Sequence, residues 1–522
     1  MALPPCETRV RIQFLEPSGW NGTPNNQVAD LPIGVRRQSG PHMAAAPNSP
    51  TTPDPTPPAP APRSTWAELR DAIRGTGADY TKIPLRRAVF LLAVPMVLEL
   101  VLESTFAVVD IFFVAKLGSS AVATVGLTET MLFLVYSIAM GLAMAVTAVV
   151  ARRVGEGQHD EAAVTTVQAI WLALIVSVPF TVAGIVYAQG LLRLMGADAW
   201  TLAHGYPYMQ WALGSNAVIM LLFTINAIFR GAGDAAAAMR VLWVANGINI
   251  VLDPILIFGF GPIPAFGLEG AAIATTIGRG SGVLMQLWIL FRGGQHLNVL
   301  RKHIGWRAAI LWNIVRTSLG GIGQMIVAMT SWIFLLRILA AIGSEAVAGA
   351  TIAIRIMMFT MMPAWGMSNA AATLVGQNLG AQHPDRAEAA VWRIGAYNMV
   401  YLLAISVVFF ALPESLMGIF TAEPAVITIG AEWLRILSYS LFVYGWWMVS
   451  VQAFNGAGDT VTPTWINVVF FWLIQIPLCW TLAVRLDWQH SGVFWGVFVS
   501  ETSVGLFTLW IFSRGRWKAA TV

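Results

Sequence analysis

Three acidic residues interrupt the first long apolar segment of the chain. Glu99, Glu103 and Asp110 lie four and seven positions apart in AVPMVLELVLESTFAVVDIFFVAKLG, so on a helix they share one face to within about 40°. A charge near the centre of a bilayer costs about 2.5–3.5 kcal/mol. We therefore interpret this acidic stripe as functional. Pro95 precedes it and removes a backbone hydrogen bond, which permits a bend, so we predict a hinge there.

A second polar stripe occurs in VLWVANGINIVLDPILIFG, where Asn246, Asn249 and Asp253 are spaced by three and four. A carboxylate in apolar surroundings is a site at which a proton or a sodium ion can bind and couple an ion gradient to transport. Neutral oxygen donors from neighbouring segments can complete such a cluster. The predicted coupling-ion or proton site comprises Asp110, Asn226, Asn249, Asp253 and Thr275.

Structural interpretations of the same residues remain open. Glu99 and Glu103 can serve only to hydrogen-bond a neighbouring helix, and Asp110 can lie near the outer surface. The pair Asp253-Pro254 can begin a break in its helix, because the residue before a proline disfavours helical geometry.

Enzyme chemistry is not indicated. The histidines are dispersed without metal-ligand spacing, and Cys6 and Cys479 lie in dissimilar settings. The two GAGD sequences, at Gly231 and Gly456, lack the GK[ST] of a phosphate-binding loop, so we predict tight turns in which the aspartate caps the next helix. We predict no cofactor, no coupling ion other than H⁺ or Na⁺, and no metal except Na⁺ at the coupling site.

The elements that must position these residues are membrane-spanning helices. The chain has 57% hydrophobic and 11% charged residues with a mean hydropathy of +0.66, and soluble domains carry about 25% charged residues. Long continuous apolar runs favour helices over a membrane barrel. We predict an all-α polytopic protein of about twelve spans, which begin near Ala88, Ser120, Ala163, His204, Ala236, Leu268, Ile310, Glu345, Ala387, Ala425, Thr460 and Gly492.

Basic residues are distributed unevenly over the predicted loops, and the positive-inside rule then places both termini in the cytoplasm. We expect the plasma membrane, which is the inner membrane of a bacterium. The opposite side keeps only scattered residues such as Lys116, Arg193 and Arg485. The predicted inside positions include Arg70, Arg74, Lys82, Arg86, Arg87, Arg152, Arg153, Arg230, Arg240, Arg292, Arg301, Lys302, Arg307, Arg386, Arg393, Arg514, Arg516 and Lys518.

An internal repeat organises the chain. LGSSAVA at Leu117 recurs as IGSEAVA at Ile342, and FRGAGD at Phe229 recurs as FNGAGD at Phe454, both with an offset of 225 positions. Each half then holds six spans in the same orientation, so the halves are related by a pseudo-two-fold axis along the membrane normal. The predicted parts are a disordered Pro-rich tail (1–63), an amphipathic lead-in helix (64–87), and two six-helix lobes (88–300 and 301–522).

The acids do not follow the repeat. Positions 225 residues after Asp110 and Asp253 hold Leu335 and Leu478, and Glu99 corresponds to Gln324. We therefore expect the coupling-ion site in the first half and a mainly structural role for the second, as a moving scaffold and cavity wall. Two further acids inside predicted spans are Glu129 and Glu501, for which Arg279 and Arg355 are the candidate partners.

These motifs together resemble the multidrug and toxic compound extrusion (MATE) transporters of the DNA-damage-inducible-F-like (DinF-like) type. The resemblance covers about residues 64–515 and rests on the Pro95-to-Asp110 spacing, FRGAGD followed by Asn249-x-x-x-Asp253, GAAIATT at Gly270 and GQNLGA at Gly376. It implies that the five polar residues of the predicted ion site belong to a network in the first lobe that protonation or sodium binding reorganises around a bending first helix. Glu99 and Glu103 lie outside that pattern and are candidate substrate-cavity acids.

The resemblance also implies a function. Such transporters expel amphipathic, often cationic compounds in exchange for H⁺ or Na⁺, as two bundles alternate between outward and inward openings. The expected partners are small organic substrates and membrane lipid, with no nucleic acid, and the chain is expected to function as a monomer. A related lipid-linked oligosaccharide flippase needs a more cationic cavity than this acidic half offers, and a membrane-embedded enzyme needs clustered His, Asp or Cys that the sequence lacks.

Overall fold

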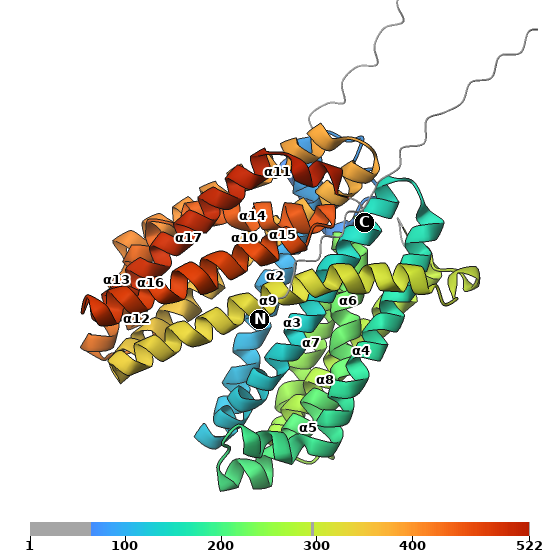
Figure 1. The fold of residues 1–522 in the computed structure, drawn as a ribbon. Coiled ribbons are helices and arrows are strands. Elements are labelled where there is room, and N and C mark those ends of the chain that lie inside the picture. The colour runs from blue at the N-terminus through green and yellow to red at the C-terminus, as the bar shows by residue number, and fades with distance from the viewer. Residues whose placement is uncertain (1–63, 294–296, 521–522) are drawn as a thin grey trace, which may run out of the picture. The chain divides into compact units, whose positions relative to one another are not determined.

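The computed structural model describes residues 64–293 and 297–520, and its regular structure there is helical apart from one isolated bridge between Phe260 and Ile263 (Figure 1). The tail 1–63, predicted to be disordered, lies outside the described residues. The first half comprises α1 (Thr65–Arg74), α2 (Leu85–Ala115), α3 (Ser119–Gly155), α4 (His159–Leu194), η1 (Thr201–Gly205), α5 (Tyr206–Gly214), α6 (Asn216–Ala232), α7 (Ala235–Phe258) and α8 (Leu268–Arg292).

The second half repeats this order. Its elements are η2 (Arg301–His303), α9 (Ala308–Ile342), α10 (Ser344–Gly380), α11 (Pro384–Ala411), α12 (Pro413–Gly418), α13 (Pro424–Ser438), α14 (Leu441–Ala457), α15 (Val461–Asn467), η3 (Val468–Gln475), α16 (Ile476–Trp480), η4 (Thr481–Arg485), α17 (Gln489–Ser513) and η5 (Arg516–Ala519). The predicted span starts all lie within four residues of an observed helix start. The all-α fold in two tandem six-helix bundles is confirmed.

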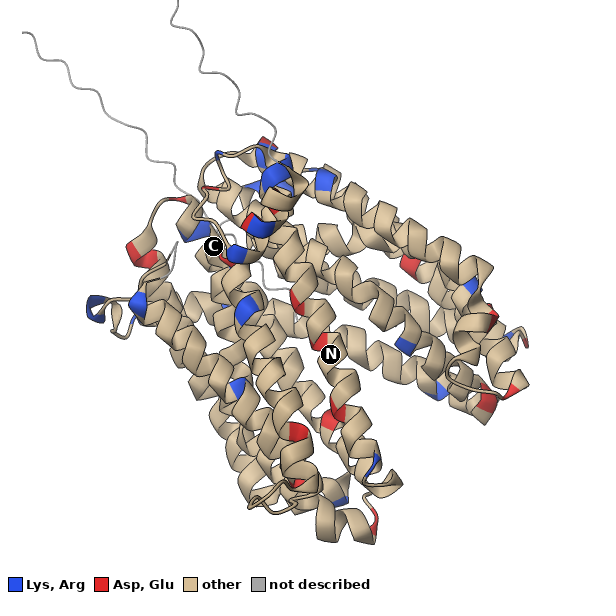
Figure 2. Ribbon diagram, turned by 180° about the vertical axis from the view of Figure 1, so that it is seen from behind, with Lys and Arg blue, Asp and Glu red and all other residues tan. Residues whose placement is uncertain are grey.

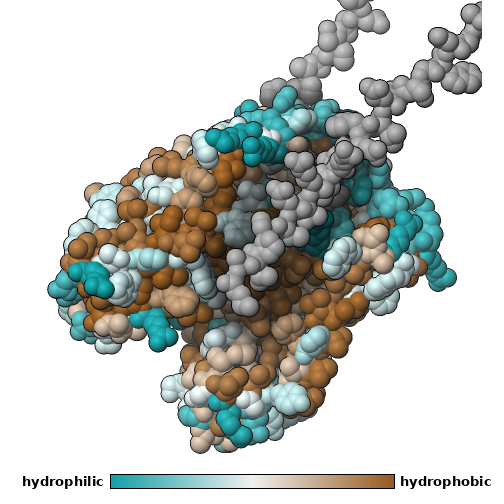
Figure 3. Space-filling view, in the orientation of Figure 1, coloured by the Kyte–Doolittle hydropathy of each residue, from teal (hydrophilic) through white to brown (hydrophobic). Residues whose placement is uncertain are grey.

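Nine helical segments of the described residues are long and apolar enough to cross a membrane, and α13 with α14 forms a tenth span bent by 62°. The predicted spans that begin near Ala88 and Leu268 correspond to α2 and α8, which carry the three acids of the stripe and Arg279. Figure 3 shows apolar side chains covering the flanks, with hydrophilic residues gathered at the ends. Figure 2 shows Lys and Arg concentrated toward one end of the helices, at the top of the view.

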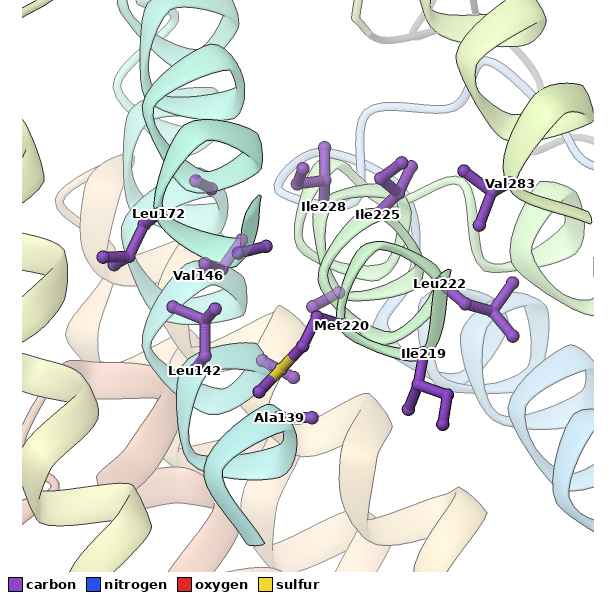
Figure 4. Close-up of a cluster of buried hydrophobic side chains, with 14 of the residues drawn as sticks. Ala139, Leu142, Val146, Leu172, Ile219, Met220, Leu222, Ile225, Ile228 and Val283 are labelled. Atoms are coloured by element: carbon purple, nitrogen blue, oxygen red, sulfur yellow. The ribbon is translucent and has the colours of Figure 1, made fainter. Parts of the chain in front are cut away.

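Small and branched apolar residues form the core of the first half (Figure 4). Leu142 and Val146 of α3 meet Met220 and Ile225 of α6 in this cluster, and Leu172 of α4 lies against them. Helices in a bilayer associate through close packing rather than through the hydrophobic effect, because lipid is as apolar as the side chains. The tight α3–α6 contact therefore holds the first half together by shape.

The first helix of each half also packs against the other half. At the start of α2, Leu92 and Met96 belong to one buried cluster with Leu374 of α10 and Val391 of α11. At the start of α9, Ile314 is buried in the core of the first half. The far end of α2 returns to the first half, where Val114 packs with residues of α3, α7 and α8.

Glycines allow the two halves to touch where α3 and α10 end. A Cβ on Gly155 would collide with the backbone of Gln377, and a Cβ on Gly380 would collide with the carbonyl of Arg152. Side chains reinforce this contact, since Gln377 Nε2 donates to the carbonyl of Gly231 at 3.0 Å and Thr373 Oγ1 donates to that of Arg230 at 3.0 Å. The halves are therefore in direct contact at this end.

Candidate functional site

The acids at the two ends of one helical turn of α2, Glu99 and Glu103, have different partners. Glu99 is buried, and its Oε1 lies 3.3 Å from Arg230 Nη1 near the end of α6. Its Oε2 is buried without a hydrogen bond. Glu99, predicted as a substrate-cavity acid, is thus half of a buried ion pair. Arg230 was expected in a loop, but α6 extends to Ala232 and brings its side chain back to α2.

Glu103 lies one turn further along α2, at the centre of a wider network. Asn246 Nδ2 of α7 donates to Glu103 Oε2 at 3.0 Å, and Arg279 Nη2 of α8 lies 3.9 Å from Oε1. Arg279 Nη1 also donates to the Tyr136 hydroxyl of α3 at 3.0 Å. The Glu103 side chain is 33% exposed, so this acid, unlike Glu99, remains accessible from outside the helix bundle.

The Asp253 side chain has no hydrogen-bond partner. It is fully buried on α7, and neither carboxylate oxygen has a hydrogen bond. Asp110 on α2 is within electrostatic range, and its Oδ1 is also buried without a hydrogen bond. Leaving a charge unpaired in a low-dielectric interior costs several kcal/mol, about what a bound proton or cation recovers. The pair therefore has the chemistry of a site that holds H⁺ or Na⁺.

One amide contact lies next to this pair, and a second lies apart from it. Asn249 Nδ2 donates to Thr275 Oγ1 of α8 at 3.1 Å, and Asn249 Oδ1 is left without a partner. Asn226 lies elsewhere, since its Oδ1 accepts from Gln286 Nε2 of α8 at 2.7 Å. The structure thus connects Asn249 with Thr275, whereas Asn226 belongs to a separate buried pair.

Other expectations need correction. α7 continues through Pro254 to Phe258, so a helix break at Asp253 is wrong. Pro95 lies buried inside the continuous helix α2, and the hinge there stays a prediction. Arg279 pairs with Glu103 rather than with Glu129 or Glu501. An electrostatic interaction links Glu129 to Arg355, whereas no ion pair of the described residues includes Glu501.

Two contributors were missed as site residues: Arg230 and Tyr136. The repeat carried a signal for Arg230, since its counterpart 225 positions later is Asn455 in an otherwise matching motif. The GAGD turns were predicted well. Asp234 accepts from the Ala237 amide at 3.1 Å and Asp459 from that of Thr462 at 3.0 Å.

This arrangement defines a class of protein. Two similar sets of membrane-crossing helices enclose uncompensated carboxylates, and the described residues contain no group of three or more His, Cys, Asp or Glu that could hold a metal ion. Buried carboxylates inside membrane-crossing helices, without a catalytic cluster beside them, are typical of a transporter with many spans.

The chain belongs to the MatE family. The family profile matches residues 95–255 and again 320–481, together more than half of the chain, and the two matches start 225 positions apart as the repeat predicts. It is therefore a multi-pass membrane transporter and not an enzyme. The DinF-like subgroup stays a prediction.

Named relatives are similar along most of their length. A probable multidrug resistance protein NorM of Thermotoga maritima is 25% identical over 442 residues, 84% of this chain and 94% of the relative. An FAD transporter of Shewanella oneidensis is 27% identical over 411 residues, 76% of this chain and 87% of the relative. The solved structure of a multidrug resistance MATE family transporter, in an outward-facing conformation, superposes with a TM-score of 0.79 at 24% identity, covering 86% of this chain and 99% of that one.

Proposed function

We propose that this chain is a secondary active efflux transporter, which exports amphipathic, often cationic organic compounds by alternating access in exchange for H⁺ or Na⁺. The observation that carries the proposal is the buried pair of Asp253 and Asp110 with unpartnered oxygens. The Thermotoga relative, named as a probable multidrug resistance protein, supports the cargo class.

The roles of the residues follow from their contacts. H⁺ or Na⁺ binds at Asp253 and Asp110, with Asn249 Oδ1 and Thr275 as neutral oxygens nearby. Asp110 also attracts Arg279. An ion bound at Asp110 weakens that attraction, and the interaction between Arg279 and Glu103 changes as a result. Because Asp110 and Glu103 lie on the same helix as Pro95, a bend at Pro95 would transmit ion binding to the face of α2 that carries Glu103.

Transport of an anionic compound is the competing function. The Shewanella relative is named an FAD transporter, and the cargo of a lipid-linked oligosaccharide flippase contains a pyrophosphate, as FAD does. Binding of a pyrophosphate uses several uncommitted cationic or N–H groups. In this half, Arg230 is committed to Glu99 and Arg279 to Glu103. The charge balance therefore favours cationic cargo. We place the protein in the bacterial inner membrane with both termini in the cytoplasm, as the distribution of Lys and Arg suggests.

Transport in proteoliposomes tests the proposal. Efflux of a fluorescent organic cation is followed under an imposed proton gradient or an imposed sodium gradient, for the wild type, Asp253→Asn and Asp110→Asn. We expect gradient-driven efflux by the wild type and none by either variant. The control is Asp234→Asn, which keeps a capping side chain outside the site. Full gradient-driven efflux by both site variants would refute the coupling site.

A further inference from the structure

A cavity of the second half lies between α9, α10, α14, η3 and α17, and Met144 of α3 also lines it. Methionine and aromatic side chains form most of its wall. Met325 and Met329 come from α9, Met357 and Met361 from α10, and Trp447 from α14. None of these residues belongs to the site already described.

One acidic side chain also lines this cavity. Glu501 of α17 is only 8% exposed, and no Lys, Arg or His of the described residues forms an ion pair with it. Two pairs of polar side chains near Glu501 hydrogen-bond with each other. Gln324 Nε2 donates to Asn455 Oδ1 at 2.9 Å, and Ser331 Oγ donates to Gln475 Oε1 at 3.4 Å. Glu501 is therefore left as the uncompensated charge of the cavity.

The repeat shows that the fold does not require this acid. The counterpart of Glu501, 225 positions earlier, is Thr276, whose hydroxyl lies 3.2 Å from Ser215 Oγ. The counterpart of the lining residue Met361 is Tyr136, which accepts a hydrogen bond from Arg279. At these two positions the second half has a carboxylate and a thioether, and the first half has hydroxyl groups. The combination is particular to the second half.

These side chains match one type of ligand. Aromatic faces attract organic cations by about 2 kcal/mol or more where water is excluded. Methionine is flexible and polarisable and adapts to ligands of different shape. A buried carboxylate supplies the opposite charge, and Trp447 Nε1, which is buried without a hydrogen-bond partner, offers one donor. We propose that this cavity is a cargo site in the second half, which binds flat, apolar, singly charged organic cations through Glu501.

The size of the cavity adds a condition. Its free volume is about 120 Å³, whereas pockets for drug-sized ligands hold about 300 Å³ or more. Cargo therefore enters only when methionine side chains change rotamer, which costs little for an unbranched chain. The proposal deepens the proposed function by naming a cargo class and its site, but it concerns equilibrium binding and does not depend on which ion drives transport.

Equilibrium binding to the purified full-length protein, with no ion gradient, tests the assignment. Ethidium is the flat monovalent cation, and phenanthridine, its neutral parent ring system, is the matched uncharged probe. We expect Glu501→Gln to weaken ethidium binding by about tenfold or more and to change phenanthridine binding less than about twofold. Glu501→Asp keeps the charge and should retain most of the affinity.

Two controls separate this result from other causes. Glu432→Gln removes an acid of the same half that accepts from Ser491 and lies outside the cavity, and it should bind both probes as the wild type does. Asp253→Asn should lose coupled efflux yet keep ethidium binding, so failure of the ion site and failure of this site are distinguishable. Unchanged ethidium binding in Glu501→Gln, or equal loss of both probes, would overturn the assignment.

Discussion

The same place in the two halves is occupied by an ion pair and by an amide pair. Glu99 and Arg230 lie 3.3 Å apart in the first half, and their counterparts at an offset of 225, Gln324 and Asn455, hydrogen-bond at 2.9 Å in the second. Both pairs join the first helix of a half to the helix before its GAGD turn. Both halves thus have a polar bridge here, and it is charged in the first half only.

The two halves also differ in their candidate sites, the ion site at Asp253 and the cavity that contains Glu501. The first half concentrates charged groups along α2 and α8 around Asp253, whereas the second half keeps one acid, Glu501, in a wall of methionine and aromatic residues. The expectation that the second half is mainly a scaffold therefore gives way to our proposal of a division of labour, in which the ion binds in one half and cargo in the other.

The largest expected effect separates these roles. Asp253→Asn should abolish gradient-driven efflux of both ethidium and phenanthridine, because no ion is then exchanged. Glu501→Gln should reduce efflux of ethidium while efflux of phenanthridine stays coupled to the gradient. Efflux from proteoliposomes, measured for each probe with the gradient on and off, checks this. Loss of coupling for both probes in Glu501→Gln would remove the distinction between the halves.

The next effect concerns the bridge itself. Arg230→Asn leaves Glu99 buried without its cation, and we expect a loss of about 3–5 kcal/mol in the free energy of unfolding. Adding Glu99→Gln creates the amide pair of the second half and should restore stability to within about 1 kcal/mol. Chemical unfolding in detergent measures both. If Arg230→Asn alone is neutral, the ion pair has no structural role.

Much of this architecture was accessible from the sequence, because hydropathy and repeat signals are summed over long segments. The twelve span starts and the GAGD caps needed only local patterns. Side-chain pairing was less accessible, because it depends on how each helix is rotated against its neighbours. Asn226 was expected near Asn249 and instead meets Gln286. Arg230 was predicted in a loop, whereas α6 continues to Ala232.

A smaller effect is expected at that missed amide pair. Gln286→Ile removes the donor to Asn226 Oδ1 and leaves a buried acceptor unsatisfied, which should cost about 1–3 kcal/mol of unfolding free energy. The second half has Val451 and Ile511 at the two equivalent positions. The double variant Asn226→Val with Gln286→Ile should therefore recover most of the loss, as thermal unfolding can show. A double variant less stable than Gln286→Ile would contradict this.

The smallest effect should be equal in both halves. Asp234→Ala and Asp459→Ala each remove a cap after a GAGD turn, and each should cost about 1 kcal/mol. Unfolding of the two single variants under the same conditions compares them. A difference larger than the cost of one cap would mean that one of these turns has a further role.

The exchange of first helices between the halves bears on how such a chain originated. Leu92 and Met96 of α2 are buried against α10 and α11, and Ile314 of α9 is buried in the first core. In a chain of half this length, the same residues would be buried only if a second copy packed against them, so the arrangement corresponds to a swapped homodimer joined into one chain. Each half can then carry its own charges.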